Sequence, residues 1–361
     1  MSNPVRLSDL TTLRLGGPAP DMVTVATMPD IVDTVGAADR AGSGVLILGG
    51  GSNLVIADRG IDTPIVRIGV RGIRVEHSGD DAAEVTIGGG ENWDDVVAQL
   101  TAAGFGEFAA LSGIPGSAGA TPIQNVGAYG CEIADVLTGV TVYDRTRREV
   151  HWMAADDLGL GYRTSVLRGT DRAVVGEMTV RLTRRAVRIR YAELARALGV
   201  ALGESAPPHE VRAAVLDLRR KKGMVLDPDD PDTHSAGSFF TNPIVDREQA
   251  RDIDEAIKAR LGPTTTYPSY PIVGADGSAN PAGRVKLSAA WLIERAGFAK
   301  GYPGPGGRVG VSGKHTLALT NRGGSTGDLI ALARQIRDGV RSAFAVTLEP
   351  EPLLIGVTLD D

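Results

Sequence analysis

The sequence predicts a globular protein of mixed helices and strands, divided into two or three domains. Three observations carry this prediction. The chain has 361 residues, which is more than one typical domain. Short runs rich in β-branched residues, typical of strands, occur at 54–56, 64–68 and 84–87. Apolar residues follow a helical spacing at 29–41 and 93–100.

The same kinds of signal place the remaining elements. Asn92 is a favourable N-cap for the second helix, with two aspartates at the positive end of that helix and Gly104 as its stop. The turn-forming run 203–208 predicts a domain linker. Other helices are expected at 209–222, about 246–260, 286–296 and 326–343, mainly strands at 136–182, and a closing strand at 353–357.

Composition and charge exclude several classes of protein. The chain carries 38 Lys and Arg against 44 Asp and Glu, a formal net charge of −6. A mildly acidic protein has no general attraction for nucleic-acid phosphates or anionic lipid, so neither nucleic acid nor a membrane is an expected partner. The longest weakly polar run, 44–57, is about 14 residues long and is interrupted by glycines, so it is too short to span a bilayer.

Two features indicate the cytoplasm. Residues 1–6 lack the charged and apolar regions of a secretory signal. The single cysteine, Cys131, has no partner in the chain for a disulfide, which is compatible with a reducing compartment. Cys131 lies in a glycine-rich stretch, and we interpret it as a small buried side chain rather than a nucleophile.

Familiar catalytic patterns fail in this sequence. Leu54 stands where a Rossmann loop beginning at Gly49 needs its third glycine. The run 323–327 fits the nucleophile-elbow pattern of hydrolases, but no histidine follows His315, so we interpret Ser325 as a helix cap. The five histidines show no metal-ligand spacing, and no metal is expected.

A first glycine-rich loop follows the apolar run 45–48. It consists of Gly49, Gly50, Gly51, Ser52 and Asn53. Successive backbone N–H groups without bulky side chains can form an anion-binding nest for a diphosphate. A tight turn between two strands explains the pattern about as well, so the loop alone leaves both interpretations open.

A second glycine-rich loop covers 113–130 and consists mostly of Gly, Ala, Ser, Thr and Pro. Backbone with such small side chains can lie flat against a large planar ligand and hydrogen-bond to its edge. A stretch this long, without helical or strand periodicity, is entropically costly as a mere connector. It therefore predicts a loop that binds a ligand.

Three further segments place polar groups in apolar surroundings, at 161–165, 236–243 and 348–352. Individually each has an ordinary explanation: a surface arginine, a capping serine and a solvated glutamate. Composition and spacing alone assign them no chemistry.

Taken in order, these segments resemble the UDP-N-acetylenolpyruvoylglucosamine reductase (MurB) family. The resemblance extends from 13–17 to 348–351, and its most specific parts are the second glycine loop, 237–243 and 222–228. It implies an α+β fold, with a vanillyl-alcohol-oxidase-type FAD-binding domain and a separate α/β substrate-binding domain. An FAD domain of this type explains the missing Rossmann pattern.

The resemblance implies FAD as the cofactor and both glycine loops as its site. The residues implied are Gly49, Gly50, Gly51, Ser52, Asn53, Gly113, Gly116, Ser117, Gly119, Gln124, Asn125 and Gly127. It also implies NADPH as the electron donor. NADPH would reduce the flavin, and hydride would then pass to the enolpyruvyl double bond of a UDP-sugar substrate.

Three residues match the family's catalytic positions. The resemblance implies that Arg163 holds the substrate carboxylate, where a charge-assisted contact strengthens as negative charge develops. It implies that Glu351 acts with Arg163 in stabilising or polarising the intermediate. Ser238 would protonate the carbanionic carbon, a downhill transfer that depends on geometry more than on acidity.

Other positions match the family's substrate contacts. The resemblance implies that Lys222 and Asn242 contact phosphate or carboxylate groups and that Tyr270 and Lys286 belong to the substrate domain. Tyr191 is the candidate for the lid tyrosine of the family's longer, type I form. The family also leads us to expect a monomer.

The expected domain division has three parts. Residues 1–60 form a small N-terminal lobe joined by the C-terminal strand 345–361, residues 61–203 form the FAD-binding domain, and residues 204–344 form the substrate-binding domain. Two alternatives to the reductase stay open. One is an FAD-dependent oxidase or dehydrogenase of another small substrate, and the other is a non-catalytic protein that binds a nucleotide sugar.

Overall fold

The computed structural model describes residues 5–77, 79, 81–272 and 283–360. Residues 1–4 and 361, which belong to the predicted N-terminal lobe and C-terminal strand, lie outside the described residues. None of the described helices is long and apolar enough to cross a membrane. The chain divides into two compact units, unit 1 with Met1–Thr11, Pro18–Ser52 and Gly60–Leu226, and unit 2 with Thr12–Gly17, Asn53–Arg59 and Asp227–Asp361.

Unit 1 contains the first glycine-rich loop as far as Ser52 and the whole of the second. Its helices are α1 (Met28–Ala41), α2 (Trp93–Ala102), α3 (Ala192–Leu198) and α4 (Pro208–Lys221), with the short 3-10 helices η1 (Leu7–Asp9), η2 (Ala109–Leu111), η3 (Ala118–Ala120), η4 (Ile133–Asp135) and η5 (Ala155–Leu158). Its strands are β1 (Val5–Arg6), β2 (Pro18–Ala19), β3 (Met22–Val25), β4 (Leu46–Leu48), β6 (Ile65–Ile68), β7 (Ile73–His77), β8 (Ala82–Gly88), β9 (Gly127–Ala128), β10 (Cys131–Glu132), β11 (Leu137–Asp144), β12 (Glu149–Ala154), β13 (Ala173–Thr183), β14 (Val187–Arg188) and β15 (Ser205–Ala206). The helices expected at 29–41 and 209–222 are confirmed as α1 and α4.

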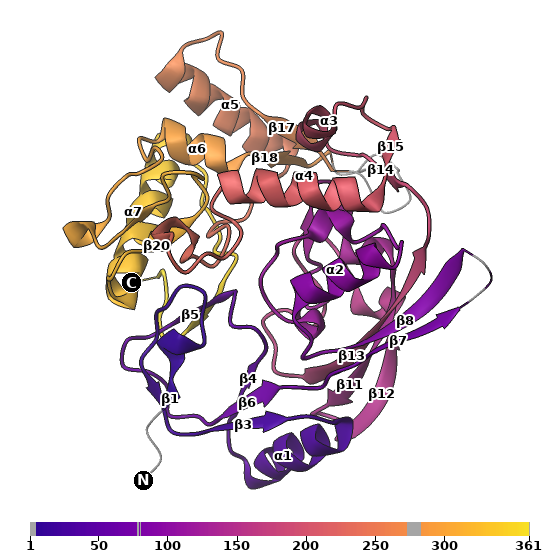
Figure 1. Ribbon diagram of the computed structural model, residues 1–361. Coiled ribbons are helices and arrows are strands. Elements are labelled where there is room, and N and C mark those ends of the chain that lie inside the picture. The colour runs from indigo at the N-terminus through magenta and orange to yellow at the C-terminus, as the bar shows by residue number, and fades with distance from the viewer. Residues whose placement is uncertain (1–4, 78, 80, 273–282, 361) are drawn as a thin grey trace. The chain divides into compact units, whose positions relative to one another are not determined.

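An antiparallel sheet of five strands, in the order β12-β11-β13-β8-β7, forms one layer of unit 1 (Figure 1). Helix α2 packs against it, and Trp93 of that helix is fully buried in the same apolar cluster as Val85 and Ile87 of β8. As expected, α2 begins after Asn92, whose side chain accepts a hydrogen bond from the N–H of Asp95 at 3.2 Å.

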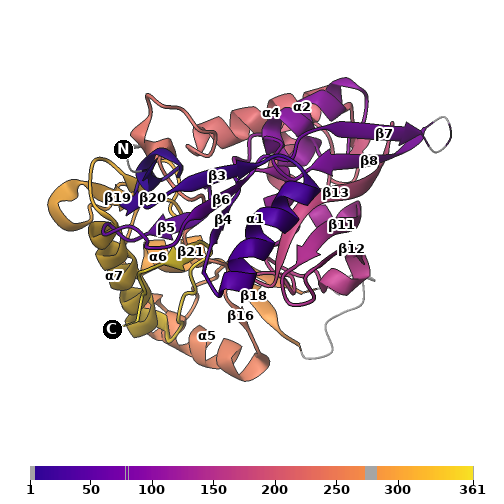
Figure 2. The same ribbon diagram turned by 90° about the horizontal axis from the view of Figure 1, so that it is seen from below.

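Unit 1 also has a parallel sheet of three strands, in the order β3-β6-β4. Helix α1 lies between this sheet and the five-stranded sheet (Figure 2). Helix α1 is the crossover that joins β3 to β4, as a parallel arrangement requires. Ile31 and Val35 of α1 are fully buried, and they pack in one cluster with Val66 of β6 and Tyr143 of β11. This packing joins the five-stranded and the three-stranded sheets of unit 1 through one helix.

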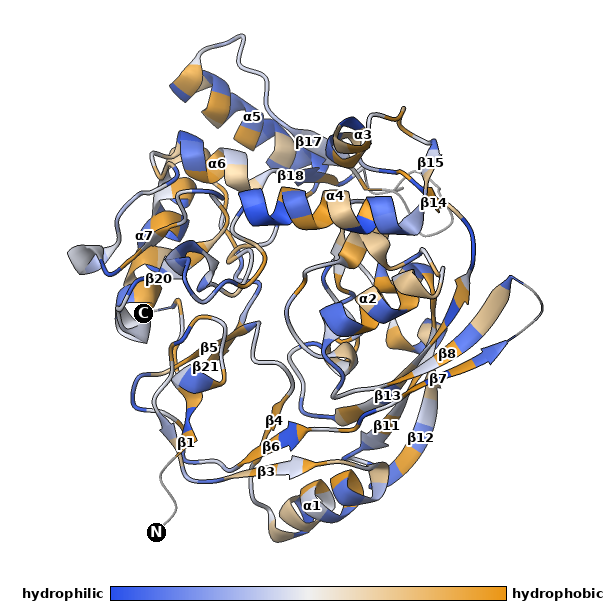
Figure 3. Ribbon diagram, in the orientation of Figure 1, coloured by the Kyte–Doolittle hydropathy of each residue, from blue (hydrophilic) through white to orange (hydrophobic). Residues whose placement is uncertain are grey.

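Helices α3 and α4 pack together through Leu194, Val211 and Val215, all of them buried. Hydrophobic and hydrophilic residues alternate along α4, as expected for a helix with one buried face (Figure 3). The segment from β14 to α4, together with Ala109 of η2, therefore forms a small apolar cluster within unit 1.

Unit 2 is built on a different core. Its helices are α5 (Arg247–Leu261), α6 (Ala289–Arg295) and α7 (Thr326–Phe344), with the 3-10 helices η6 (Pro231–Thr233) and η7 (Pro305–Gly307). Its strands are β5 (Leu54–Ile56), β16 (Ile244–Val245), β17 (Ser269–Pro271), β18 (Val285–Leu287), β19 (Val309–Val311), β20 (Leu319–Asn321) and β21 (Leu353–Ile355). The closing strand is confirmed as β21, which pairs in parallel with β5.

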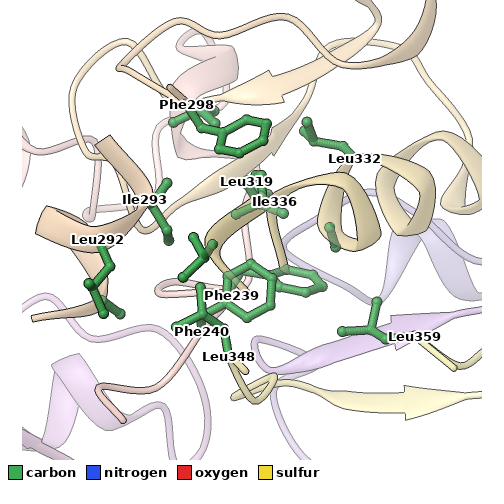
Figure 4. Packing of buried hydrophobic residues seen from close by; sticks show 14 of the residues in the cluster. Phe239, Phe240, Leu292, Ile293, Phe298, Leu319, Leu332, Ile336, Leu348 and Leu359 are labelled. Atoms are coloured by element: carbon green, nitrogen blue, oxygen red, sulfur yellow. The ribbon is translucent and has the colours of Figure 1, made fainter. Parts of the chain in front are cut away.

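The core of unit 2 centres on Phe239 and Phe240, whose ring centroids lie 5.1 Å apart in an edge-to-face arrangement (Figure 4). Both rings are buried in one cluster with Ile293 of α6 and Ile336 of α7. The segment that contains the predicted proton donor is thus anchored by the two largest side chains beside it.

The expected helix at 286–296 starts later than predicted. Residues 285–287 form strand β18, and the helix, α6, begins at Ala289. The side chain of Ser288 accepts a hydrogen bond from the N–H of Trp291 at 3.3 Å, so Ser288 is the N-cap that separates the strand from the helix. The serine was a start signal that the apolar spacing alone did not reveal.

The interpretation of Ser325 as a helix cap is confirmed. Its hydroxyl accepts a hydrogen bond from the N–H of Asp328, and the carboxylate of Asp328 accepts one from the N–H of Ser325, both at 3.0 Å. This reciprocal capping box begins α7.

We predict that Ser325→Ala lowers the free energy of unfolding by about 1 kcal/mol, because it removes the cap of α7. Ser325→Gly is the matched control and should cost only a few tenths of a kcal/mol, since glycine is tolerated at an N-cap. Urea unfolding of the two variants measures the difference. Equal losses would contradict a capping role.

Candidate active site

The first glycine loop follows β4 and turns sharply at Gly51, which has φ +64°. A Cβ atom at Gly51 would collide with the carbonyl oxygen of Leu10, so both the backbone angle and the space require glycine there. Among the described residues, the N–H groups of Gly50 and Gly51 have no hydrogen-bond acceptor. Consecutive N–H groups of this kind are the donors that a diphosphate needs.

The two glycine loops lie against each other within unit 1. A Cβ at Gly50 would come within 2.5 Å of the Cα of Gly116, and the hydroxyl of Ser52 donates to the carbonyl of Pro115 at 2.9 Å. A Cβ at Gly49 would likewise collide with the side chain of Ser117. The structure therefore brings together the residues that the sequence analysis assigned to one cofactor.

The second loop is also tied to the five-stranded sheet. The N–H of Gly119 donates to the carbonyl of Gly89 at 2.9 Å, and a Cβ at Gly119 would come within 2.9 Å of the Cα of Gly89. Gln124 is half-buried in the same loop, whereas Asn125 is almost fully buried. A loop of small residues next to the N–H groups of Gly50 and Gly51 fits an FAD group.

Sequence reasoning missed the anchor at the start of the second loop, Asp94. Its carboxylate accepts a hydrogen bond from the N–H of Gly113 at 2.6 Å and two from the guanidinium of Arg212, at 2.6 and 3.0 Å. Burial alone would raise the pKa of Asp94, but these donors hold it below its ordinary value. The sequence showed Asp94 only as a helix-start residue, because its partners are far away in the chain.

Arg163 occupies a tight turn next to the second loop. Its backbone is left-handed, with φ +53°, between Gly161 and Thr164, which form an isolated β-bridge. Its guanidinium donates to the carbonyl of Gly127 at 2.5 Å. The hydroxyl of Ser165 donates to the second loop as well, which fixes the turn against it.

Tyr191 and Lys222 come together in unit 1 around Tyr129, a residue of the second loop. The rings of Tyr191 and Tyr129 are edge to face, with centroids 5.7 Å apart, and the ammonium of Lys222 lies 5.6 Å from the centre of the Tyr129 ring. Lys222 also pairs with Glu193 at 2.6 Å. Burial raises the pKa of Tyr129 to about 12, so its hydroxyl keeps its proton at neutral pH.

The chain segments that contain Ser238 and Glu351 pair with each other in unit 2. The N–H of Glu351 donates to the carbonyl of Phe239 at 2.9 Å, and Phe240 forms a β-bridge with Pro350. Both Ser238 and Glu351 are half-buried. Two of the three predicted catalytic residues are thus held by paired backbone segments.

Asn53, the last residue of the first glycine loop, belongs to unit 2. Its side-chain amide donates to the backbone carbonyl of Glu351 at 3.3 Å, and its own carbonyl accepts from the N–H of Leu353 at 2.9 Å. The structure therefore connects a predicted FAD residue with a predicted catalytic one. Sequence analysis could not indicate this contact, because 298 positions separate the two residues.

The other predicted substrate residues of unit 2 lie around β18. Tyr270 of β17 and Lys286 of β18 are paired across the sheet, and Tyr270 is exposed. The side chain of Asn242 accepts a hydrogen bond from the N–H of Ala289 at 2.9 Å, at the start of α6. Asn242 therefore has a structural contact besides any contact with a ligand.

Cys131 is not set up as a nucleophile. Its thiol donates to the carbonyl of Glu107 at 3.1 Å, and burial raises the pKa of the thiol to about 12. The thiolate, which is the reactive form, is therefore scarce at neutral pH. This supports the interpretation that Cys131 is not a nucleophile, although the residue is half-buried rather than fully buried.

Comparisons with known proteins identify the family. Residues 229–355 match the model of the UDP-N-acetylenolpyruvoylglucosamine reductase C-terminal domain, and residues 20–152 match an FAD binding domain. A UDP-N-acetylenolpyruvoylglucosamine reductase of Saccharopolyspora erythraea is 52% identical over 98% of this chain and 95% of its own length. The chain belongs to the UDP-N-acetylenolpyruvoylglucosamine reductase family. A relative from Thermobifida fusca with the same name is 51% identical over 98% of both chains.

A solved structure supports the fold. The UDP-N-acetylenolpyruvylglucosamine reductase (MurB) of Thermus caldophilus matches with a TM-score of 0.64 and 22% identity, over 98% of both chains. The predicted resemblance and the predicted α+β fold, with an FAD-binding domain and a second domain, are confirmed. Membership in the family and the FAD-binding domain also confirm FAD as the cofactor and oxidoreductase as the class of enzyme.

We predict that Gly51→Ala purifies with less FAD than the unchanged protein, because the added methyl group must displace the Leu10 carbonyl from the first glycine loop. Absorbance at the flavin bands relative to protein measures the FAD content.

Gly42→Ala is the matched control for this variant. Gly42 has almost the same φ, +66°, but a Cβ there meets nothing within 4 Å. In both variants the free energy of unfolding should fall by about 1 kcal/mol because of backbone strain. In Gly51→Ala it should fall by about 1–3 kcal/mol more because of crowding. Equal FAD content and equal free energies of unfolding in the two variants would contradict the role of Gly51 in shaping the FAD loop.

Proposed function

We propose that the chain reduces UDP-N-acetylglucosamine enolpyruvate to UDP-N-acetylmuramate with NADPH, as a step in peptidoglycan precursor synthesis. The observation that carries the proposal is the backbone pairing between the segment that follows Ser238 and the segment that contains Glu351. It occurs in a chain about half identical to proteins named UDP-N-acetylenolpyruvoylglucosamine reductase. The three-part domain division, the cytoplasmic location and the monomeric state stay predictions.

The glycine loops would hold the cofactor. The N–H groups of Gly50 and Gly51 offer donors to its diphosphate, and the flat second loop offers small side chains to its ring system. When bound, FAD supplies a carrier that accepts hydride from NADPH and passes it to the substrate. The protein groups then bind the substrate, stabilise charge and deliver one proton.

Arg163 would hold the substrate carboxylate. Addition of hydride to the terminal carbon of the double bond places negative charge on the neighbouring carbon and its carboxylate. A guanidinium already fixed to the Gly127 carbonyl can meet that charge with little reorganisation. Glu351 would act with Arg163 on the same intermediate.

Ser238 would supply the proton that completes the reduction. A serine hydroxyl is a weak acid, but a carbanionic carbon is basic enough to make the transfer downhill. The hydroxyl therefore needs a fixed position more than a low pKa. The buried rings of Phe239 and Phe240 next to Ser238 provide such a fixed segment.

The remaining candidates would bind the UDP-sugar. Tyr191 and Lys222, together with Tyr129, offer aromatic rings and one cation, a combination suited to a diphosphate. Tyr191 is exposed, so its side chain is accessible to a substrate. Asn242, Tyr270 and Lys286 would contribute contacts from unit 2.

One spectroscopic experiment tests the whole proposal. NADPH added without oxygen should bleach the flavin bands, and the enolpyruvyl UDP-sugar should then restore them. Rapid reoxidation by oxygen with no response to the UDP-sugar would favour the oxidase alternative. Tight binding of the UDP-sugar without reoxidation would favour a non-catalytic binding protein.

We predict that Ser238→Ala keeps the reduction of flavin by NADPH within about twofold but slows reoxidation by the substrate by about 10²–10⁴, the usual contribution of a positioned proton donor. Stopped-flow absorbance follows both half-reactions. Ser325→Ala, the same exchange at the cap of α7, is the control and should leave both rates unchanged. Equal loss of both half-reactions in Ser238→Ala would remove Ser238 from the proton-donor role.

A further inference from the structure

Backbone strain gathers around Arg163. Six non-glycine residues of the described chain have positive φ, and three of them, Arg163, Asn125 and Tyr129, lie in this turn and in the second glycine loop. Non-glycine residues keep such a conformation only where surrounding contacts over-determine it, and they cluster at functional sites. The contacts that hold Arg163 are therefore candidates for a functional role.

Glu132 faces the guanidinium of Arg163. An oxygen of its carboxylate lies 3.9 Å from Nη1, while the other terminal nitrogen of Arg163 donates to the carbonyl of Gly127. Strand β10 pairs Glu132 directly opposite Gly127. A Cβ on Gly127 would come within 2.7 Å of the Glu132 side chain and 3.2 Å of Nη1, so glycine leaves the space in which the two charges meet.

Asn125 fixes Glu132 in turn. Its amide nitrogen donates to the second carboxylate oxygen of Glu132 at 2.8 Å and to the carbonyl of Gly161 at 3.0 Å. Its amide oxygen accepts from the N–H of Ala134 at 2.9 Å, and the residue is 1% exposed. One buried side chain thus fixes the carboxylate beside the arginine tip and the turn that carries the arginine backbone.

We propose that Glu132 is a positioning residue, which fixes the guanidinium of Arg163 in the orientation that receives the substrate carboxylate. This inference rests on the proposed function, in which Arg163 binds that carboxylate. The distance of 3.9 Å is too long for a hydrogen bond, so the attraction between Glu132 and Arg163 acts through space. A guanidinium carries five N–H donors. It can therefore bind a substrate carboxylate while it remains hydrogen-bonded to the carbonyl of Gly127 and close to the carboxylate of Glu132.

Glu132→Gln tests this role, because glutamine can still accept the hydrogen bond from Asn125 but lacks the charge. We expect reoxidation of the reduced enzyme by the enolpyruvyl UDP-sugar to slow about tenfold, because a small misplacement of a binding group is enough to lower the rate. The substrate dissociation constant, measured by calorimetry on the oxidised enzyme, should rise. Flavin reduction by NADPH, the FAD content and the unfolding midpoint of FAD-free protein should stay unchanged.

Glu149→Gln is the matched control. Glu149 lies 3.8 Å from Arg147, nearly the same distance as in the pair under test, but it is exposed on β12. In this variant all five measurements should give the same values as in the unsubstituted protein. A lower unfolding midpoint in Glu132→Gln, or an equal loss of both half-reactions, would show a merely structural role and overturn the proposal.

A double-mutant cycle with Arg163→Lys decides whether Glu132 acts through Arg163. In the Arg163→Lys background, Glu132→Gln should change the substrate dissociation constant and the reoxidation rate by less than about twofold, because the group that it positions is gone. A tenfold effect that persists in this background would overturn the proposal. If the unchanged enzyme fails to reduce the UDP-sugar, the proposed function fails, whereas turnover that is indifferent to Glu132→Gln overturns only this inference.

Discussion

The close approach of the two glycine loops is the constraint on which the candidate cofactor site depends. Gly50 and Gly116 leave no room for a side chain between them, and the hydroxyl of Ser52 bridges to Pro115 across the same gap. Neither loop gains its hydrogen bonds from a long ladder, so these local contacts decide its shape. The first loop is therefore a tight turn and an open row of N–H donors at once, and the two interpretations of its sequence do not compete.

The second loop also holds Arg163, the arginine proposed to bind the substrate carboxylate. Three contacts tie it to the turn at 161–165: Ser165 to the carbonyl of Ile123, Asn125 to the carbonyl of Gly161, and Arg163 to the carbonyl of Gly127. In each contact a side chain donates to a backbone carbonyl, so each depends on the residue that supplies the donor. The loop proposed to bind the flavin and the arginine proposed to bind the substrate therefore share one hydrogen-bonded framework in unit 1.

The sequence predicted those features whose cause is local. The caps at Asn92 and Ser325 were recognisable because the donor lies three residues away in the chain. The contacts between Asp94 and Arg212 and between Asn53 and Glu351 could not be recognised in the sequence. They join residues that are distant in the chain, and no periodic pattern indicates them. The catalytic roles came from the resemblance, because an arginine in a turn has an ordinary explanation until its surroundings are known.

Rigidity of the segment around Ser238 would compensate for the weak acidity of this proposed proton donor. Phe239 and Phe240 are both almost completely buried, so the segment that follows Ser238 cannot shift without opening the core. The backbone of the same segment pairs with 349–351, and Asn53 holds the carbonyl of Glu351 from the other side. Because the transfer of a proton to carbon depends on distance more than on acidity, a serine between a buried core and a paired backbone is a suitable donor, and no shifted pKa is needed.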